Sequence, residues 1–136
     1  MTIHLQSQKK RILVVDDQVS DTLLVKRFLE DTNEYEVKEL NDASAALSAA
    51  EHFQPHLILL DVMMPDINGG ELAARFRENP NLKTVPIVFL TARVTKEEVD
   101  LCGGRIGQYP VLAKPIVQTE LVWCVKQHLT TLAIQR

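Results

Sequence analysis

A chain of 136 residues with 46% hydrophobic and 24% charged residues has the size and composition of one globular domain. Its formal net charge of −3 is small, and no basic patch indicates a nucleic-acid-binding protein. Two cysteines, Cys102 and Cys124, make no disulfide framework. No apolar run resembles a signal peptide or reaches membrane-spanning length, so a cytoplasmic protein without membrane contacts is expected.

The first predicted strand covers residues 11–15 and stops at the acidic pair Asp16 and Asp17. It is short, β-branched and without alternation, which is typical of a parallel strand buried on both faces. The period then changes to that of a helix over residues 20–30. Apolar residues four positions apart form one stripe there: Leu24 with Phe28, and Val25 with Leu29.

The alternation of strand and helix continues through the middle of the chain. A second strand is predicted over residues 35–40, and an alanine-rich helix follows over residues 43–53 until Pro55 ends it. A third apolar strand, residues 57–60, stops at another aspartate, Asp61. The remaining elements are a helix ending at residue 78, a strand at 86–90, a short helix at 95–101, a strand at 109–113 and a helix at 118–132.

This order of elements predicts an α/β fold, a three-layer sandwich around a parallel five-stranded sheet. Right-handed crossovers favour the flavodoxin-like (βα)5 arrangement with strand order 2-1-3-4-5. Pro110 lies inside the fifth strand, which favours a position at the sheet edge. Residues 11–132 then form one domain between two short tails, residues 1–10 and 133–136.

Polar side chains follow four of the predicted strands at the point where each strand ends. They are Asp16 and Asp17, Asp61, Thr91 and Lys114. Because the carboxyl ends of parallel strands face one crevice, we expect these side chains to converge. Three neighbouring carboxylates repel one another, and a hard divalent cation such as Mg²⁺ relieves that repulsion. Asp61 can then be the nucleophile for a phosphoryl group, with Lys114 as fixed positive charge and Thr91 as hydroxyl donor.

Each of these residues has a simpler interpretation when it is taken alone. A single aspartate at a strand end is usually a loop residue or a helix N-cap, and a threonine or lysine there is commonplace. Their joint placement at four strand ends favours a shared site. His52 and His56 lie four positions apart, but Pro55 breaks the helix that would align them, so we interpret both as surface residues.

The polar residues also lie within four short motifs. These are Val14-Val15-Asp16-Asp17, Asp61-Val62-Met63-Met64-Pro65 with Gly69 following, Leu90-Thr91-Ala92, and Lys114-Pro115. In this order and spacing, the chain over about residues 10–132 resembles the receiver domains of two-component response regulators, the family of the bacterial chemotaxis regulator. Each motif alone is a common string, whereas the ordered set is specific.

The resemblance implies a role for each residue in phosphorelay signal transduction. Asp61 would accept a phosphoryl group from a histidine kinase or phosphotransfer protein, so the chain would be a phosphoacceptor and not an enzyme. Thr91 and Lys114 would each contact an oxygen of that group. Mg²⁺ would be held by three carboxylates and one backbone carbonyl, those of Asp16, Asp17, Asp61 and Met63.

The sequence departs from the family pattern before Lys114. The family usually carries Tyr or Phe three residues before this lysine, where the ring accompanies a movement of the strand-four hydroxyl. Val111 stands there in this chain, and the nearest aromatic residue is Tyr109. The family's glycine-alanine segment is also replaced by a glycine-rich connection over residues 103–107.

The output of the chain is expected to be a protein contact, because no DNA-binding domain follows the last helix. The resemblance implies that such a stand-alone receiver would signal through its fourth helix, fifth strand and last helix. In the last helix, the inward stripe is predicted to contain Leu121, Val125, Leu129 and Leu132. Trp123 then points to solvent, where it would contact a partner or a second copy of the chain. The alternative is that it lies along the domain surface under neighbouring side chains.

Two other functions compete with this interpretation. A Mg²⁺-dependent phosphohydrolase would normally carry an aspartate two residues after the nucleophile as general acid, and Met63 cannot donate that proton. A receiver-like interaction module without phosphorylation would not need the complete set of polar residues.

Overall fold

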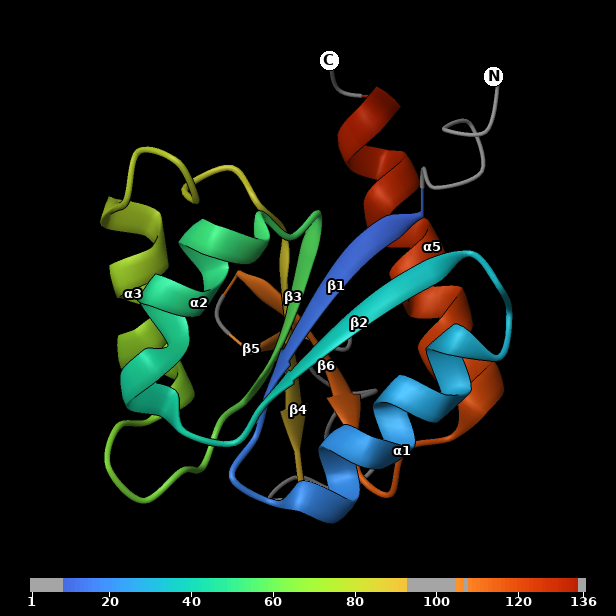
Figure 1. Ribbon diagram of the computed structural model, residues 1–136, viewed down its shortest axis with the longest axis horizontal. Helices are drawn as coiled ribbons and strands as arrows, with labels where there is room; N and C mark the ends of the chain where they lie inside the picture. Colours follow the sequence, from blue (N-terminus) through green and yellow to red (C-terminus); the bar gives the residue numbers. More distant parts are fainter. Residues whose placement is uncertain (1–8, 93–104, 107, 135–136) are drawn as a thin grey trace.

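The computed structural model describes residues 9–92, 105–106 and 108–134, with backbone only for residues 105–106 and 131–134. A central sheet separates two helical layers, with α2 and α3 on one face and α1 and α5 on the other (Figure 1). The elements in chain order are β1 (Lys10–Val15), α1 (Val19–Glu30), β2 (Tyr35–Leu40), η2 (Ala43–Ala45), α2 (Ala46–Phe53), β3 (Leu57–Asp61), α3 (Gly69–Glu78), β4 (Ile87–Thr91), β5 (Arg105–Ile106), β6 (Tyr109–Ala113) and α5 (Gln118–Ile134).

The sheet has the order β2-β1-β3-β4-β6-β5. The first five strands are all parallel, so the predicted order 2-1-3-4-5 is confirmed. The sixth, β5, was not predicted: it is two residues long and pairs antiparallel with β6, placing Arg105 opposite Pro110. The strand that contains Pro110 is therefore the outermost parallel strand, but its outer side carries a short antiparallel partner.

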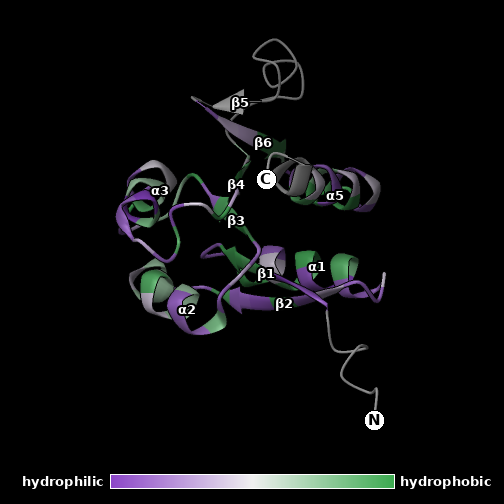
Figure 2. Cartoon of the chain, turned by 90° about the horizontal axis from the view of Figure 1, so that it is seen from above, coloured by the Kyte–Doolittle hydropathy of each residue, from purple (hydrophilic) through white to green (hydrophobic). Residues whose placement is uncertain are grey.

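Each central strand is buried on both faces, as its continuous apolar run predicted. Ile12 and Val14 belong to a core that α1 and α5 cover. Leu13 and Val15 point the other way, into a second core that α2 and α3 cover. Figure 2 shows β1 and β3 as hydrophobic between the helical layers, whereas the outer strand β2 is largely hydrophilic. Hydrophobic burial on both faces holds the sheet between its helices.

Local sequence signals explain where several helices begin and end. Asn68 caps α3 by accepting a hydrogen bond from the Glu71 amide, and the Glu71 carboxylate accepts one from the Asn68 amide in return. The helix α2 stops at Gln54, whose left-handed backbone (φ 54°) precedes Pro55. A residue before proline is disfavoured in the helical region, so Pro55 ends this helix as predicted.

The last helix shows the predicted division between inner and outer faces. Leu121 and Val125 are buried and Leu129 packs partly against the same core, whereas Trp123 is 65% exposed. The side chain of Leu132 and the helix predicted over residues 95–101 lie outside the described residues. Among the described helices, none is both long enough and apolar enough to cross a membrane.

Candidate functional site

The carboxyl ends of four strands bring the predicted polar residues to one edge of the sheet. In the pairing register, Val15 lies opposite Leu60, Asp61 opposite Leu90 and Thr91 opposite Ala113. Asp16 therefore follows β1 beside the end of β3, and Lys114 follows β6 beside Thr91. Asp16, Asp61 and Thr91 are buried, so these polar residues lie inside the edge of the fold.

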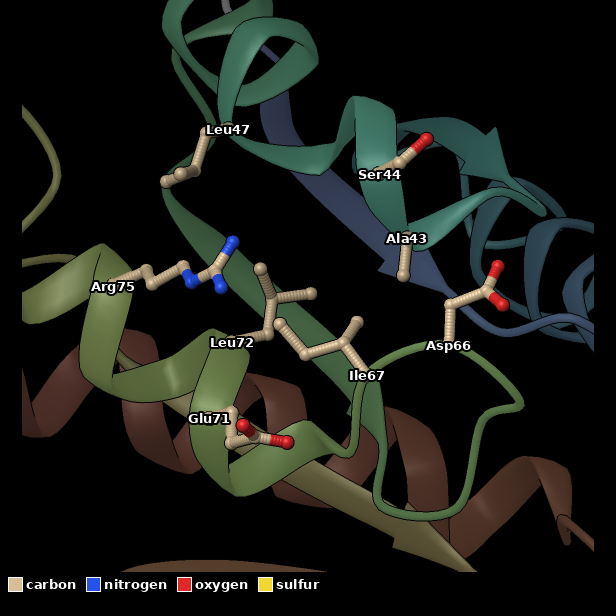
Figure 3. Close-up of a pocket in the computed structure, with 8 residues that line it drawn as sticks. All are labelled: Ala43, Ser44, Leu47, Asp66, Ile67, Glu71, Leu72 and Arg75. Carbon is tan, nitrogen blue, oxygen red and sulfur yellow. The ribbon is translucent and has the colours of Figure 1, made fainter.

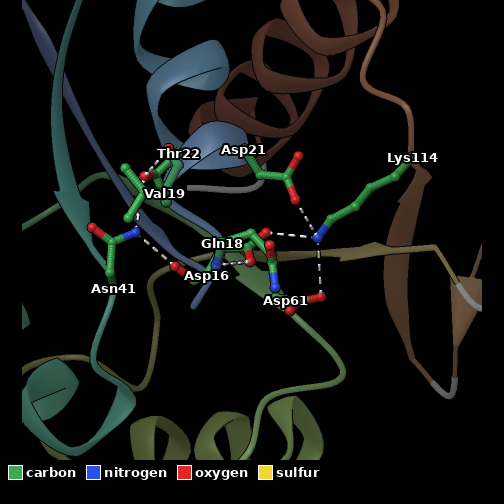
Figure 4. A network of polar contacts seen from close by, with 8 residues as sticks. All are labelled: Asp16, Gln18, Val19, Asp21, Thr22, Asn41, Asp61 and Lys114. Atoms are coloured by element: carbon green, nitrogen blue, oxygen red, sulfur yellow. Dashed lines mark hydrogen bonds and ion pairs between the residues drawn. The ribbon is translucent and has the colours of Figure 1, made fainter.

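Lys114 connects the site across more than ninety residues of sequence (Figure 4). Its Nζ lies 2.7 Å from Asp16 Oδ2 and 3.5 Å from Asp61 Oδ1. It also donates a hydrogen bond of 2.9 Å to Oδ2 of Asp21, in the first turn of α1. The lysine is thus surrounded by three carboxylates from three segments. The peptide bond that joins it to Pro115 is cis.

The carboxylates of Asp16, Asp17 and Asp61 form a group with the chemistry of a metal site. One oxygen from each lies within 4.8 Å of the other two, the one such group of three or more potential metal ligands found among the described residues. Asp16 Oδ2 is buried and receives no aligned hydrogen bond from the described groups; its close contact is the ion pair with Lys114. Buried carboxylate oxygens with unused lone pairs suit a hard, oxygen-binding divalent cation.

The electrostatics of the site raise the pKa of both central groups, which disfavours the charged form of Asp61 and favours the charged form of Lys114. Burial, followed by the negative charge of Asp16, raises the pKa of Asp61 from 3.8 to about 6, although Lys114 opposes the shift. Burial alone would lower the pKa of Lys114, but its contacts with Asp16 and Asp21 outweigh burial and raise that pKa above its ordinary value. Lys114 therefore stays charged, while the Asp61 carboxylate lacks full neutralisation without a second cation.

A hydrogen-bond network holds Asp16 and the turn that follows β1. The Asp16 Oδ1 atom accepts a hydrogen bond from the Gln18 amide at 2.9 Å. The Asn41 side chain donates to the Asp16 carbonyl oxygen at 2.8 Å and to the Thr22 hydroxyl at 3.0 Å. These bonds join the ends of β1 and β2 to the start of α1, and they fix the position of Asp16.

Gly69 allows the backbone of α3 to approach Asp61 closely. A Cβ atom at this position would lie 2.5 Å from the Asp61 carbonyl oxygen and 2.9 Å from Val62 Cα. The Gly69 amide donates a hydrogen bond of 2.8 Å to the Val62 carbonyl oxygen. Gly69, which follows the Asp61 motif, therefore sets the course of the loop after Asp61. This loop also contains Met63, whose side chain is 48% exposed.

Tyr109, the aromatic residue nearest to Lys114 in the sequence, does not lie opposite Thr91 in the sheet. Tyr109 packs edge to face on Phe89, with 5.1 Å between ring centroids, and the Arg77 guanidinium lies 5.7 Å from the Tyr109 centroid. The register puts Phe89 opposite the buried Val111 and Thr91 opposite Ala113, so Tyr109 lies beyond this pairing. Tyr109 thus contacts α3 and β4, and Val111 fills the position where the family pattern has an aromatic ring.

A cavity of about 240 Å³ lies beside the site but does not contain it (Figure 3). It opens between η2, α2 and α3, next to the loop after β3, and is lined by Ala43, Ser44, Leu47, Asp66, Ile67, Glu71, Leu72 and Arg75. None of these residues belongs to the acidic group. The site is therefore identified by its converging charges and not by the size of a cavity.

The structure brings together the four charged residues that the sequence predicted, and it adds two that the prediction missed. Asp21 looked like an ordinary acidic residue in the first turn of a helix, where the helix dipole favours it. Asn41 directly follows β2, so its position at a strand end was a usable signal. His52 and His56 make separate backbone contacts, with the Ser48 carbonyl oxygen and the Arg11 amide; His52 is exposed as predicted, whereas His56 is half-buried.

Comparison with known proteins agrees with this geometry. The family model described as response regulator receiver domain matches residues 12–126. The response regulator Rre1 of Synechocystis is 33% identical over 119 residues, which cover 87% of this chain and 51% of Rre1, so the chain spans about half of that relative. A 14.6 kDa protein of the sodA1 3′ region of Leptolyngbya boryana is 38% identical, covering 86% of this chain and 88% of that protein.

A solved structure extends the likeness to three dimensions. The response regulator of Desulfuromonas acetoxidans superposes with a TM-score of 0.76 at 28% identity, covering 90% of this chain and 98% of that one. The matched family model includes residues of all five parallel strands and the acidic group. The chain is therefore a member of the response regulator receiver domain family.

Proposed function

We propose that this chain accepts a phosphoryl group on Asp61 from a phosphohistidine of a histidine kinase or phosphotransfer protein. The observation that carries the proposal is the position of Lys114, whose ammonium contacts Asp61, while Asp61 also forms a group of three carboxylates with Asp16 and Asp17. This arrangement offers a nucleophile, a fixed positive charge and a set of cation ligands in one place.

The reaction assigns a task to each side chain. An oxygen of the Asp61 carboxylate attacks phosphorus, the new P–O bond forms as the P–N bond of the phosphohistidine breaks, and the histidine nitrogen keeps the bonding electron pair. Lys114 neutralises one phosphoryl oxygen, and the Thr91 hydroxyl donates a hydrogen bond to another. The product is an acyl phosphate on Asp61, so the chain is a phosphoacceptor and does not turn over a substrate.

The donor set fits Mg²⁺ as the cofactor of this reaction. Asp16, Asp17 and Asp61 would hold the ion together with the backbone carbonyl of Met63, because oxygen ligands of this kind suit it. When bound, Mg²⁺ supplies the positive charge that offsets the carboxylates and the incoming phosphoryl oxygens. The unaligned Oδ2 of Asp16 and the raised pKa of Asp61 both support a site that needs this charge.

Covalent labelling tests the proposed function. Incubation with phosphoramidate and Mg²⁺ should add one phosphoryl group to the wild type, detected by intact mass spectrometry, and none without Mg²⁺. Asp61→Asn should abolish the label because the amide is no nucleophile. Asp66→Asn, which changes an exposed carboxylate in the same loop, should leave labelling unchanged.

The other outcomes of this experiment are equally informative. Release of phosphate from added small esters, with loss of that turnover in Asp61→Asn, would instead indicate a phosphohydrolase. No label and no turnover in the wild type would leave a receiver-like interaction module. Labelling that persists in Asp61→Asn would place the phosphoacceptor elsewhere.

We further propose that the phosphorylated domain signals through the face formed by β6 and α5. Trp123 is the most exposed of the large hydrophobic residues described, and it lies on α5 opposite the buried Leu121 and Val125. An exposed tryptophan costs hydration free energy that a protein partner or a second copy would recover.

Trp123→Ala should weaken this contact without unfolding the domain, since the side chain lies outside the core. Sedimentation velocity with and without Mg²⁺ and beryllofluoride should show at least about tenfold weaker self-association, or a pull-down should show equally weaker capture of a partner. Leu23→Ala, at an exposed apolar residue of α1, is the matched control. Equal association of the wild type and Trp123→Ala would contradict the assignment of this face.

A further inference from the structure

Asp21 is a fourth carboxylate of the site, outside the group of three that would hold a cation. It lies in the first turn of α1, and its side chain is 27% exposed. Its Oδ2 atom accepts a hydrogen bond of 2.9 Å from the Lys114 ammonium (Figure 4). An acidic residue of an ordinary solvated helix end would have no such partner.

The Lys114 ammonium lies closer to Asp21 than to the phosphoacceptor. Its distance to Asp21 Oδ2 is 2.9 Å, whereas its distance to Asp61 Oδ1 is 3.5 Å. The contact with Asp21 has hydrogen-bond geometry, while Asp16 Oδ2 receives no aligned hydrogen bond. Asp21 is therefore a direct hydrogen-bond partner of the Lys114 ammonium, although it lies outside the group of three carboxylates.

Phosphorylation changes what this lysine must neutralise. A phosphoryl group on Asp61 replaces one carboxylate charge by a more highly charged anion and needs the Lys114 ammonium. Because an ammonium has three N–H donors and a single charge, a carboxylate that holds it competes with the phosphoryl oxygens. Asp16, at 2.7 Å, also holds the ammonium, but it belongs to the proposed cation site, where a bound cation would offset its charge; Asp21 lies outside that group.

We propose that Asp21 is a positioning residue that draws Lys114 toward α1 in the unphosphorylated site and thereby lowers the stability of the phosphorylated state. The inference rests on the proposed function, because it concerns how Lys114 meets a phosphoryl group on Asp61. Removal of the Asp21 charge should release the ammonium to that group.

Binding of a phosphoryl analogue tests this role. Asp21→Asn keeps the size of the side chain and an acceptor oxygen but removes the charge. In the presence of Mg²⁺, beryllofluoride should bind Asp21→Asn about three to ten times more tightly than the wild type, measured by isothermal titration calorimetry. Asp31→Asn, at an exposed carboxylate that ends the same helix, changes the net charge equally and should bind within about twofold of the wild type.

The same substitution in a protein that lacks the lysine shows whether Asp21 acts through Lys114. In Lys114→Ala, the further change Asp21→Asn should alter analogue affinity by less than about twofold, because the ammonium that it positions is absent. A full three- to tenfold gain in this background would mean that Asp21 repels the anion directly, and it would overturn the positioning role.

A readout without metal or analogue completes the test. The ¹H–¹⁵N signal of the Lys114 ammonium in metal-free protein should shift and exchange faster with water in Asp21→Asn, and Asp31→Asn should leave it unchanged. Equal spectra, or unchanged or weaker analogue binding in Asp21→Asn, would overturn the inference. A wild type that neither binds the analogue nor takes the label would overturn the proposed function itself.

Discussion

Gly69→Ala is expected to lower the free energy of unfolding by about 2–4 kcal/mol, because the new methyl group has no space beside the phosphoacceptor. Its Cβ would lie 2.5 Å from the Asp61 carbonyl oxygen, a backbone atom that a side-chain rotation cannot move away. Either the start of α3 or the end of β3 must shift. Urea unfolding followed by circular dichroism measures the loss, and phosphoramidate labelling of Asp61 should fall with it.

Gly70→Ala provides the control for this prediction. The neighbouring glycine occupies the same first turn of α3, but its added Cβ would meet only the Asn68 Oδ1 atom, at 3.3 Å. Alanine is favoured over glycine in a helix by up to about 1 kcal/mol, so Gly70→Ala should be neutral or slightly stabilising. Equal losses in the two variants would show that disturbance of the Asn68 cap, and not the approach to Asp61, controls this loop.

Asp61→Asn should stabilise the metal-free domain by about 1–3 kcal/mol near pH 7.5, although it removes the proposed phosphoacceptor. The folded chain raises the pKa of Asp61 to about 6 from 3.8, so its ionised form is less favourable in the fold than in the unfolded chain. At pH values above the folded pKa of Asp61, the wild type is destabilised by the full additional free energy of ionising this carboxyl group in the fold. The amide carries no charge and avoids it.

The stability gain from Asp61→Asn should depend on pH, and it should be largest above the folded pKa of Asp61. As the pH falls through about 6, the folded wild type takes up a proton on Asp61, and the advantage of Asp61→Asn should shrink until it vanishes near the unfolded pKa of 3.8. Urea unfolding with EDTA at several pH values measures the difference between the two proteins. Asp66→Asn is the control and should show no such trend, and adding Mg²⁺ should stabilise the wild type more than Asp61→Asn.

A stability gain that stayed constant with pH would contradict this origin. Destabilisation by Asp61→Asn near pH 7.5 would show that the contact with Lys114 outweighs burial and the repulsion from Asp16. In either case the carboxylates would already be balanced without a cation, and the argument for a metal at this site would weaken.

The parallel core could be predicted because its signals are local. Buried strands are short apolar runs, and β2 and β6 have the same bounds in the prediction and the structure. Pro55 ends α2 through the backbone of the residue before it. In contrast, the two-residue strand β5 is too short to produce a periodic pattern, and its pairing depends on the hairpin that returns the chain to β6.

The sequence alone determined which residues could meet at the site. In a parallel sheet, every strand ends at the same edge, so polar residues placed directly after strands must converge, and Asp16, Asp61 and Lys114 do so. Which of these side chains touch one another depends on the three-dimensional packing. Asp21 contacts Lys114 because the first turn of α1 lies beside the residue that follows β6, and Gly69 is required because α3 begins against the end of β3. Such contacts depend on how helices dock on the sheet, and side-chain packing between distant segments sets that arrangement rather than any local pattern.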